Sequence, residues 1–235
     1  YGDWSSDVCS SDLMVILCLL AKKVDKPIKW VQTRREHLLG GTHAPDCKVE
    51  MKMALKKDGT ILGLDIKDFE NDGSFIHTAG IYSLIKFATL VGCYRIRGTR
   101  MELVSVAANK GPTVQNRGVG KPTAIFTLER MVNIAAKKLG MDPVDIRLKN
   151  FVTPKDMPYT TPSGEVYESG NYPECLQRAL KAVDYEGWRK KQAEALKQGK
   201  YIGIGISTGV EPGTSNLGYY YTSSGIPEYM GSAEG

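Results

Sequence analysis

Apolar and polar residues largely alternate along several segments of the chain, which is the pattern of a half-buried strand. Residues 47–55 and 61–69 alternate in this way, and Lys57-Asp58-Gly59 between them is a hairpin signal. The two segments therefore predict an antiparallel pair. Further strands are predicted over residues 27–33, 98–107 and 201–208.

Apolar residues three and four positions apart predict helices elsewhere. The clearest such segment runs from Thr123 to Leu139 and is ended by Gly140. Asp142 as N-cap and Pro143 as first helical residue predict a second helix that reaches Asn150. Two more helices are predicted over residues 171–183 and 188–198. Hairpins combined with packed amphipathic helices indicate the α+β class.

An apolar run from Met14 to Ala21 is typical of the end of a buried helix that Lys22 and Lys23 close. The run is far shorter than the ~20 residues of a membrane span. It also lacks the basic region that precedes the apolar part of a signal peptide. We therefore expect no membrane span and a cytoplasmic location.

The first thirteen residues stand apart from these patterns. Asp3 to Leu13 matches, without a mismatch, the translation of a common DNA-sequencing adapter. Such added segments are left out of fold reasoning. We expect residues 1–13 to be an adapter-derived artefact that packs against nothing, with Trp4 outside any core. The remaining residues, 14–235, have a length that suits one large domain or two small ones.

The charge of the chain changes this picture little. The sequence has 31 basic and 26 acidic residues, a formal net charge of +5. Without Asp3, Asp7 and Asp12 of the adapter-like segment, 23 acidic residues remain and the net charge is +8. Such a surplus suits an anionic cofactor, a nucleic acid or no particular partner. The last of these is the default expectation.

The cysteines outside the adapter-like segment are Cys18, Cys47, Cys93 and Cys175. They are widely spaced and form no C-x-x-C pair, which argues against a disulfide framework and against a zinc site. We expect buried free thiols in a reducing compartment.

A glycine-rich connection from Gly111 to Pro122 is the main candidate site. Glycines allow a backbone to approach a ligand closely. The helix that follows offers free N–H groups to an anion, and Arg117 adds a planar set of donors. Composition alone does not distinguish this loop from an ordinary connection.

Several motifs follow one another in the order and at the spacing of one known family. They are Pro27–His37, Asn109-Lys110, Arg117–Pro122, Phe126–Arg130, Leu139–Phe151 and Thr161–Gly164. Together they resemble the molybdopterin-binding large subunit of the molybdenum hydroxylases, the xanthine dehydrogenase and aldehyde oxidase family. The resemblance spans nearly all of residues 14–235, and implies that they are part of the catalytic domain of that subunit.

The resemblance implies an oxidoreductase that hydroxylates an aldehyde or an N-heterocycle, with water as the oxygen source and a glutamate as general base. It implies a molybdenum–molybdopterin cofactor, which we expect in its cytosine dinucleotide form. It also implies [2Fe-2S] clusters and FAD on an iron–sulfur subunit and a FAD-binding subunit, or on corresponding domains, which take up the electrons.

The resemblance also assigns roles within the loop. Arg117 matches the family's arginine at the molybdenum cofactor, and Gln115, Asn116 and Gly118 beside it are expected to bind the cofactor too. Val119 stands where some relatives place an aromatic residue that stacks on a purine, which argues against a large flat heterocycle as substrate. The carbon monoxide dehydrogenases carry Cys-Ser-Phe next to this arginine. Gly118-Val119-Gly120 therefore argues against carbon monoxide as substrate.

Two features of the family are expected outside this sequence. A glycine-rich phenylalanine loop belongs before Met14, and the glutamate base belongs beyond Gly235. We therefore expect a piece truncated at both ends, which holds one wall of the site, contains no catalytic residue and no metal ligand, and is inactive alone.

Other candidate residues carry less weight. His37 and His43 have H-x5-H spacing but no third ligand, and are expected to be surface or turn histidines. Lys86 lies near an arginine of purine-oxidising relatives, but not in register with it, and is expected to be solvated. The glycines of residues 203–209 lack the spacing of a dinucleotide loop, and Tyr219–Tyr221 suit packing.

A non-enzymatic basic domain that binds nucleic acid or protein is the alternative to the enzyme. Only the basic surplus supports it, because no nucleic-acid motif is recognisable. Genes for a flavin subunit and an iron–sulfur subunit beside this one would favour the enzyme.

Overall fold

The computed structural model describes residues 11–44, 46–74, 86–113, 118 and 120–210. The chain divides into two compact units. Unit 1 comprises residues 1–50, 67–86 and 102–120, and unit 2 comprises residues 51–66, 87–101 and 121–235. The expectations for Trp4 and for Tyr219–Tyr221 fall outside the described residues.

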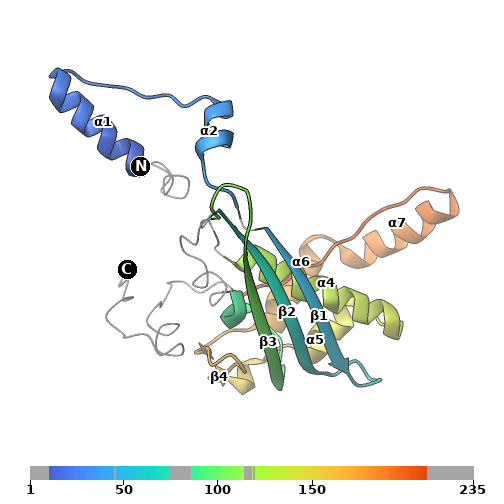
Figure 1. Cartoon of the computed structure of the whole chain (residues 1–235). Helices are drawn as coiled ribbons and strands as arrows, with labels where there is room; N and C mark the ends of the chain where they lie inside the picture. Colours follow the sequence, from blue (N-terminus) through green and yellow to red (C-terminus); the bar gives the residue numbers. More distant parts are fainter. Residues whose placement is uncertain (1–10, 45, 75–85, 114–117, 119, 211–235) are drawn as a thin grey trace. The chain divides into compact units, whose positions relative to one another are not determined.

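A three-stranded sheet contains the predicted hairpin. Its strands are β1 (Asp46–Leu55), β2 (Ile61–Gly73) and β3 (Gly98–Ala107), and β2 lies in the middle (Figure 1). The turn between β1 and β2 is closed by Lys56 N, which donates to Thr60 O at 2.9 Å. Gly59 in this turn has a φ of 87°, which glycine adopts without strain. The predictions of the hairpin and of the strand over residues 98–107 are confirmed.

Four helices of unit 2 confirm the helical periodicity of the sequence. They are α4 (Lys121–Leu139), α5 (Pro143–Asn150), α6 (Tyr172–Ala182) and α7 (Tyr185–Lys197). The predicted cap is present, since Asp142 accepts from Val144 N at 2.8 Å, and Asn171 caps α6 by accepting from Glu174 N at 3.2 Å. The helix α7 begins three residues earlier than predicted, because Asp184 caps it by accepting from Gly187 N.

The apolar core of the described residues lies in unit 2. Ile61, Leu64 and Ile66 of β2 are buried, as are Leu128 and Val132 of α4. The helix α4 also packs against α5. Not every apolar position of α4 turns inward, however. Phe126 is 71% exposed and Ile134 is 37% exposed, because the apolar residues of this helix spread beyond its inner face.

Unit 1 includes α1 (Ser11–Val24) and α2 (Arg34–Gly40). A capping box fixes the start of α2, since Glu36 N donates to Thr33 Oγ1 and Thr33 N donates to Glu36 Oε2. The helix predicted over residues 14–21 is confirmed, but its burial is not, because apolar side chains such as Leu19 are exposed on α1. Hydrophobicity predicts that a segment prefers to be buried, but it does not identify the surface against which the segment packs.

Two predicted strands are wrong. Residues 27–33 and 201–208 have no regular secondary structure, although exposed and half-buried residues alternate along the second segment. A strand requires a hydrogen-bonded neighbour, and polarity patterns do not reveal one. Conversely, a small hairpin of β4 (Tyr159–Thr160) and β5 (Val166–Tyr167) lies where no strand is predicted, and follows the 3-10 helix η2 (Pro154–Asp156).

The cysteines correct another expectation. Of the four described thiols, all free, only Cys93 is buried; Cys47 is half-buried, and Cys18 and Cys175 are exposed. Burial, with the charge of Glu129, raises the pKa of Cys93 to about 12, so this thiol stays protonated. Among the described helices, none combines the length and the apolar character needed to cross a membrane.

Candidate functional site

The glycine-rich loop is described in part. Gln115, Asn116, Arg117 and Val119 lie outside the described residues, so their roles remain predictions. Gly118 is described and has a φ of 90°, and Gly120 has a φ of 71°. Both values lie in the left-handed region, which favours glycine.

The start of the loop is held by the end of β2, within unit 1. Thr113 N donates to Asp72 O at 3.0 Å, and Thr113 Oγ1 donates to Asn71 O at 2.8 Å. His43 N donates to Pro112 O at 3.0 Å from the other side. These bonds fix the backbone two residues before Gln115. His43 forms an isolated bridge with Thr113, is exposed and lies close to Gly111, as expected for a surface histidine.

Gly73 and Gly111 bring two backbone segments into direct contact. A Cβ atom on Gly73 would overlap the carbonyl oxygen of Gly111, and Gly73 also has a φ of +80°. Hydrogen bonds close the crossing, since Ala108 N donates to Gly73 O and Ser74 N donates to Lys110 O, each at 2.9 Å. Only glycine meets both demands at position 73.

Gly73→Ala is expected to destabilise the protein more than Gly140→Ala. Gly140 has a φ of +66°, but a Cβ atom at this position would have no neighbour within 4 Å, so Gly140 shares the backbone strain without the overlap. The strain alone costs about 1–3 kcal/mol, and the overlap at Gly73 adds to it. Urea unfolding of both variants measures the difference. Equal losses would contradict the close contact.

The inner face of β2 becomes acidic towards this crossing. Asp68, Glu70 and Asp72 are buried there at alternate positions. The ammonium group of Lys86 forms ion pairs with Asp68 and Glu70, and Ser105 Oγ donates to Asp72. The expectation of a solvated Lys86 is therefore wrong, because this lysine is 2% exposed and pairs with carboxylates that the strand turns inward.

Burial and pairing act against each other in this cluster. Burial raises the pKa of Asp68, although Lys86 opposes the shift. Burial alone would lower the pKa of Lys86, but its hydrogen bonds to Asp68 and Glu70 outweigh burial and raise it. Lys86 is thus held in its charged form. The buried Asp68 Oδ1 has no hydrogen-bond partner among the described residues.

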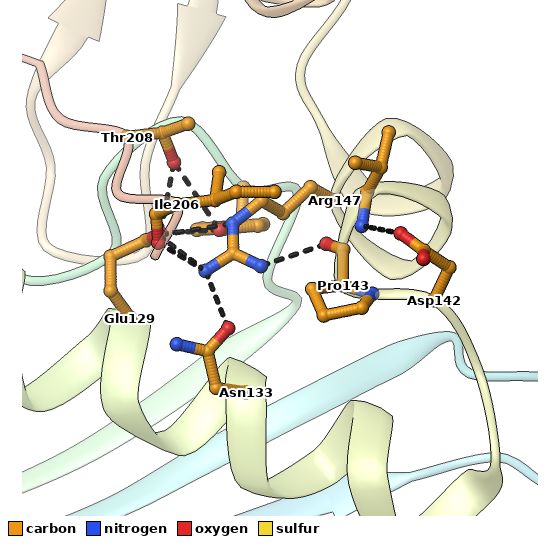
Figure 2. A network of polar contacts seen from close by, with 9 residues as sticks. Glu129, Asn133, Asp142, Pro143, Arg147, Ile206 and Thr208 are labelled. Atoms are coloured by element: carbon orange, nitrogen blue, oxygen red, sulfur yellow. Dashed lines mark hydrogen bonds and ion pairs between the residues drawn. The ribbon is translucent and has the colours of Figure 1, made fainter. Parts of the chain in front are cut away.

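A second buried network lies in unit 2 and centres on Arg147 (Figure 2). Its Nε and Nη2 donate to Glu129 Oε2 at 3.0 and 2.6 Å. Nη1 donates to Pro143 O at 2.7 Å, and Nη2 also donates to Asn133 Oδ1 at 3.0 Å and to Ile206 O at 3.1 Å. Arg147 is fully buried and Glu129 is 3% exposed. The charges therefore compensate each other inside the core.

The other oxygen of Glu129 is also occupied. Tyr94 donates its hydroxyl hydrogen to Glu129 Oε1, and Thr208 Oγ1 donates to the same oxygen at 2.9 Å. Burial, followed by the charge of Glu129, raises the pKa of Tyr94, so its hydroxyl stays protonated and keeps donating. The network joins α4, α5, the segment before β3 and the segment after α7.

Two motifs that carry the family resemblance are thus structural in this protein. Glu129 belongs to Phe126–Arg130, and Arg147 belongs to Leu139–Phe151. Asn150 of the second motif is also buried, and its Oδ1 accepts from Ile61 N at 2.8 Å while its Nδ2 donates to Gly59 O at 2.9 Å. These motif residues build the scaffold.

No metal-binding cluster of three or more His, Cys, Asp or Glu side chains is found in the described part of the chain. His37 is exposed in the last turn of α2. A dinucleotide-binding turn joins a strand to a helix. Residues 203–210 contain neither a strand nor the start of a helix.

Comparison with known proteins identifies the family. Residues 8–151 match the molybdopterin cofactor-binding domain. The chain is 32% identical over 208 residues to the nicotine 6-hydroxylase large subunit of Paenarthrobacter nicotinovorans, covering 87% of this chain and 25% of the relative. It is 34% identical over 198 residues to the carbon monoxide dehydrogenase large chain of Hydrogenophaga pseudoflava, covering 79% and 24%.

Solved structures agree with these sequence matches. The fold resembles quinoline 2-oxidoreductase from Pseudomonas putida 86 with a TM-score of 0.79 and 31% identity, covering 88% of this chain and 27% of the other. The chain thus spans about a quarter of the length of these relatives. The matches favour the enzyme over a basic binding domain. The chain belongs to the molybdopterin-binding large subunits of the xanthine dehydrogenase and aldehyde oxidase family.

Proposed function

We propose that this chain is part of the catalytic subunit of a molybdenum-dependent hydroxylase that oxidises an aldehyde or an N-heterocycle, with water as the oxygen source. The match of residues 8–151 to the molybdopterin cofactor-binding domain carries this proposal, because it includes the whole glycine-rich loop. The names of three relatives, a nicotine hydroxylase, a quinoline oxidoreductase and an aldehyde oxidoreductase, support the substrate class.

The described part of the loop fits an anionic pterin cofactor. Gly118 and Gly120 have left-handed backbones that leave no side chain in the way of a close approach. The first turn of α4, which follows Gly120, has no acidic residue, so its positive end is not neutralised. Molybdenum on the pterin supplies the redox chemistry when it is bound.

The proposed roles within the loop come from the family resemblance. Arg117, Gln115, Asn116 and Gly118 hold the cofactor, and Val119 contacts the substrate. Arg117 contributes a planar set of charged donors, which suits phosphate and pterin oxygens. A valine at position 119 leaves room for a substrate smaller than a purine and provides no aromatic stacking surface.

The proposal includes further parts that this chain does not carry. The glycine-rich phenylalanine loop lies before Met14 and the general-base glutamate beyond Gly235, so residues 14–235 are a piece truncated at both ends, and residues 1–13 derive from an adapter. The cofactor is the cytosine dinucleotide form. An iron–sulfur subunit and a FAD-binding subunit receive the electrons, and the complete enzyme is cytoplasmic.

Arg117→Ala is expected to lower the molybdenum content or the turnover of the complete enzyme sharply, because a charged donor at the cofactor is lost. Elemental analysis of molybdenum and assays with aldehydes and N-heterocycles measure the two effects. Arg130→Ala is the control, since Arg130 is exposed on α4. Full metal loading with unchanged turnover in Arg117→Ala would remove Arg117 from the site.

The activity itself is tested with the complete reading frame that contains this sequence. The purified enzyme should contain molybdenum and a pterin nucleotide, and should transfer electrons from an aldehyde or an N-heterocycle to an artificial acceptor. Incorporation of oxygen from labelled water would identify water as the source. A protein without pterin, or a product that takes its oxygen from O₂, would overturn the proposal.

A further inference from the structure

Unit 2 contains a cavity of about 690 Å³. This volume is typical of a site for a small molecule. Four segments line the cavity. They are the end of the β1–β2 turn with the first residue of β2, residues 95–97, the end of α5, and residues 159–162 of β4 and the following loop. We propose that this cavity binds the phosphate group of a small molecule. The proposal goes beyond the hydroxylase function and does not depend on it.

Three cations line the cavity, Arg95, Arg97 and Lys149. Among the residues that the structure describes, two carboxylates form ion pairs with them, and both pairs are long. Lys149 Nζ is 3.3 Å from Asp58 Oδ2, and Arg95 Nη1 is 3.8 Å from Asp156 Oδ1. The exposed guanidinium of Arg97 has no ion pair or hydrogen bond within the described residues. The lining of the cavity therefore has a net positive charge, and the guanidinium group of Arg97 is available to donate hydrogen bonds to a ligand.

The end of α5 would otherwise repel an anion, because the last carbonyl groups of a helix carry partial negative charge. Arg95 removes this obstacle. Its Nη2 donates to Lys149 O at 3.2 Å, and its backbone N donates to Asn150 O at 2.7 Å. An anion in the cavity thus meets the charged donors of Arg95 and Arg97 beside carbonyl groups that are already occupied.

The walls of the cavity are held in place before any ligand arrives. Asn150, which is 3% exposed, binds the β1–β2 turn through Ile61 N and Gly59 O. Its backbone oxygen binds Arg95 N, so three of the four lining segments meet at this one residue. Preorganisation of this kind reduces the entropy that binding must overcome.

The arrangement of donors favours phosphate over carboxylate. The charged groups come from residues 95–97 and from α5, and the exposed Thr160 adds a hydroxyl from β4. A phosphate ester presents three acceptor oxygens in a tetrahedral arrangement, whereas a carboxylate presents two in a plane. Donors from several directions match the tetrahedral group, and an arginine fork binds two of its oxygens.

Calorimetric titration of the full chain with inorganic pyrophosphate, and with malonate as a carboxylate probe, tests this site at constant ionic strength. Pyrophosphate is expected to bind about tenfold more tightly than malonate. Arg97→Gln should weaken pyrophosphate binding by about tenfold or more, because the available fork is lost. The control is Arg100→Gln, which removes the same charge from an exposed residue that does not line the cavity.

Three results would overturn the proposal: no binding of pyrophosphate, equal binding of malonate, or equal weakening by Arg97→Gln and Arg100→Gln. The last result would show a general effect of surface charge. Unfolding curves of both variants should coincide with that of the parent chain, because both arginines are exposed. The two proposals can fail separately. An active hydroxylase that does not bind pyrophosphate would overturn this proposal alone, and a protein that binds pyrophosphate without hydroxylase activity would overturn the proposed function alone.

Discussion

Arg147→Met should lower the free energy of unfolding by about 3–5 kcal/mol, the usual cost of removing one partner of a buried ion pair. Glu129 is 3% exposed and would lose the guanidinium that pairs with it. The carbonyl groups of Pro143 and Ile206 would lose their donors as well. Urea unfolding followed by circular dichroism measures the loss.

Two further variants separate charge from packing in this prediction. Arg178→Met removes an arginine that is 79% exposed and pairs with Glu174 at 2.5 Å, so it should cost at most about 1 kcal/mol. The double variant Glu129→Gln/Arg147→Met should be more stable than Arg147→Met alone, because no charge is left buried. If Arg147→Met lowers the free energy of unfolding no more than Arg178→Met does, the buried ion pair does not stabilise unit 2.

Residues 14–235 expressed alone should show no steady hydroxylase turnover. The general base that we place outside this sequence contributes about 10²–10⁴-fold in comparable enzymes. The loop of residues 111–122 would also contact the cofactor from one side only. We therefore expect the molybdenum content to be low as well as the turnover rate. Elemental analysis and assays with an artificial acceptor measure both quantities.

The complete subunit, purified in the same way, is the control for this prediction. It should carry molybdenum and turn over the same aldehydes and N-heterocycles. Stoichiometric molybdenum with steady turnover in residues 14–235 would show that the site is complete within them. The proposal of a base outside the sequence would then be wrong, whereas the family would stand.

The helices were the most predictable part of the fold. Their periodicity and caps depend on residues close in sequence, as with Asp142 and Asn171, and the structure has both caps. Strands depend on a neighbour elsewhere in the chain. Residues 201–208 alternate as a strand would, yet Ile206 and Thr208 bond to Arg147 and Glu129. Alternation was therefore necessary for a strand, but not sufficient.

Buried charges were the part that sequence reasoning missed. The alternation that placed Leu64 and Ile66 inside also places Asp68 and Glu70 inside, and two buried carboxylates require a buried cation. That signal could have identified Lys86. Glu129 and Arg147 gave a weaker signal, because they are 18 residues apart on different helices and only their place in the family motifs marks them.

The candidate site was predictable only through the resemblance. Glycine content and a following helix describe many loops, and they do not distinguish Arg117 from other arginines. The structure adds the anchoring of Thr113 and the conformations of Gly118 and Gly120. The side chains expected to meet the cofactor, Gln115 to Arg117, lie outside the described residues.

The change from apolar to acidic residues along β2 also determines how this strand aligns with its neighbours. A shift by two residues keeps every side chain on its own face, so alternation alone cannot prevent it. A shift of β2 in one direction would move Asp68 into the place of the buried Ile66, and a shift in the other direction would move Ile66 into the place of Asp68, which pairs with Lys86. Charge thus disfavours two-residue shifts that the alternation of faces would tolerate.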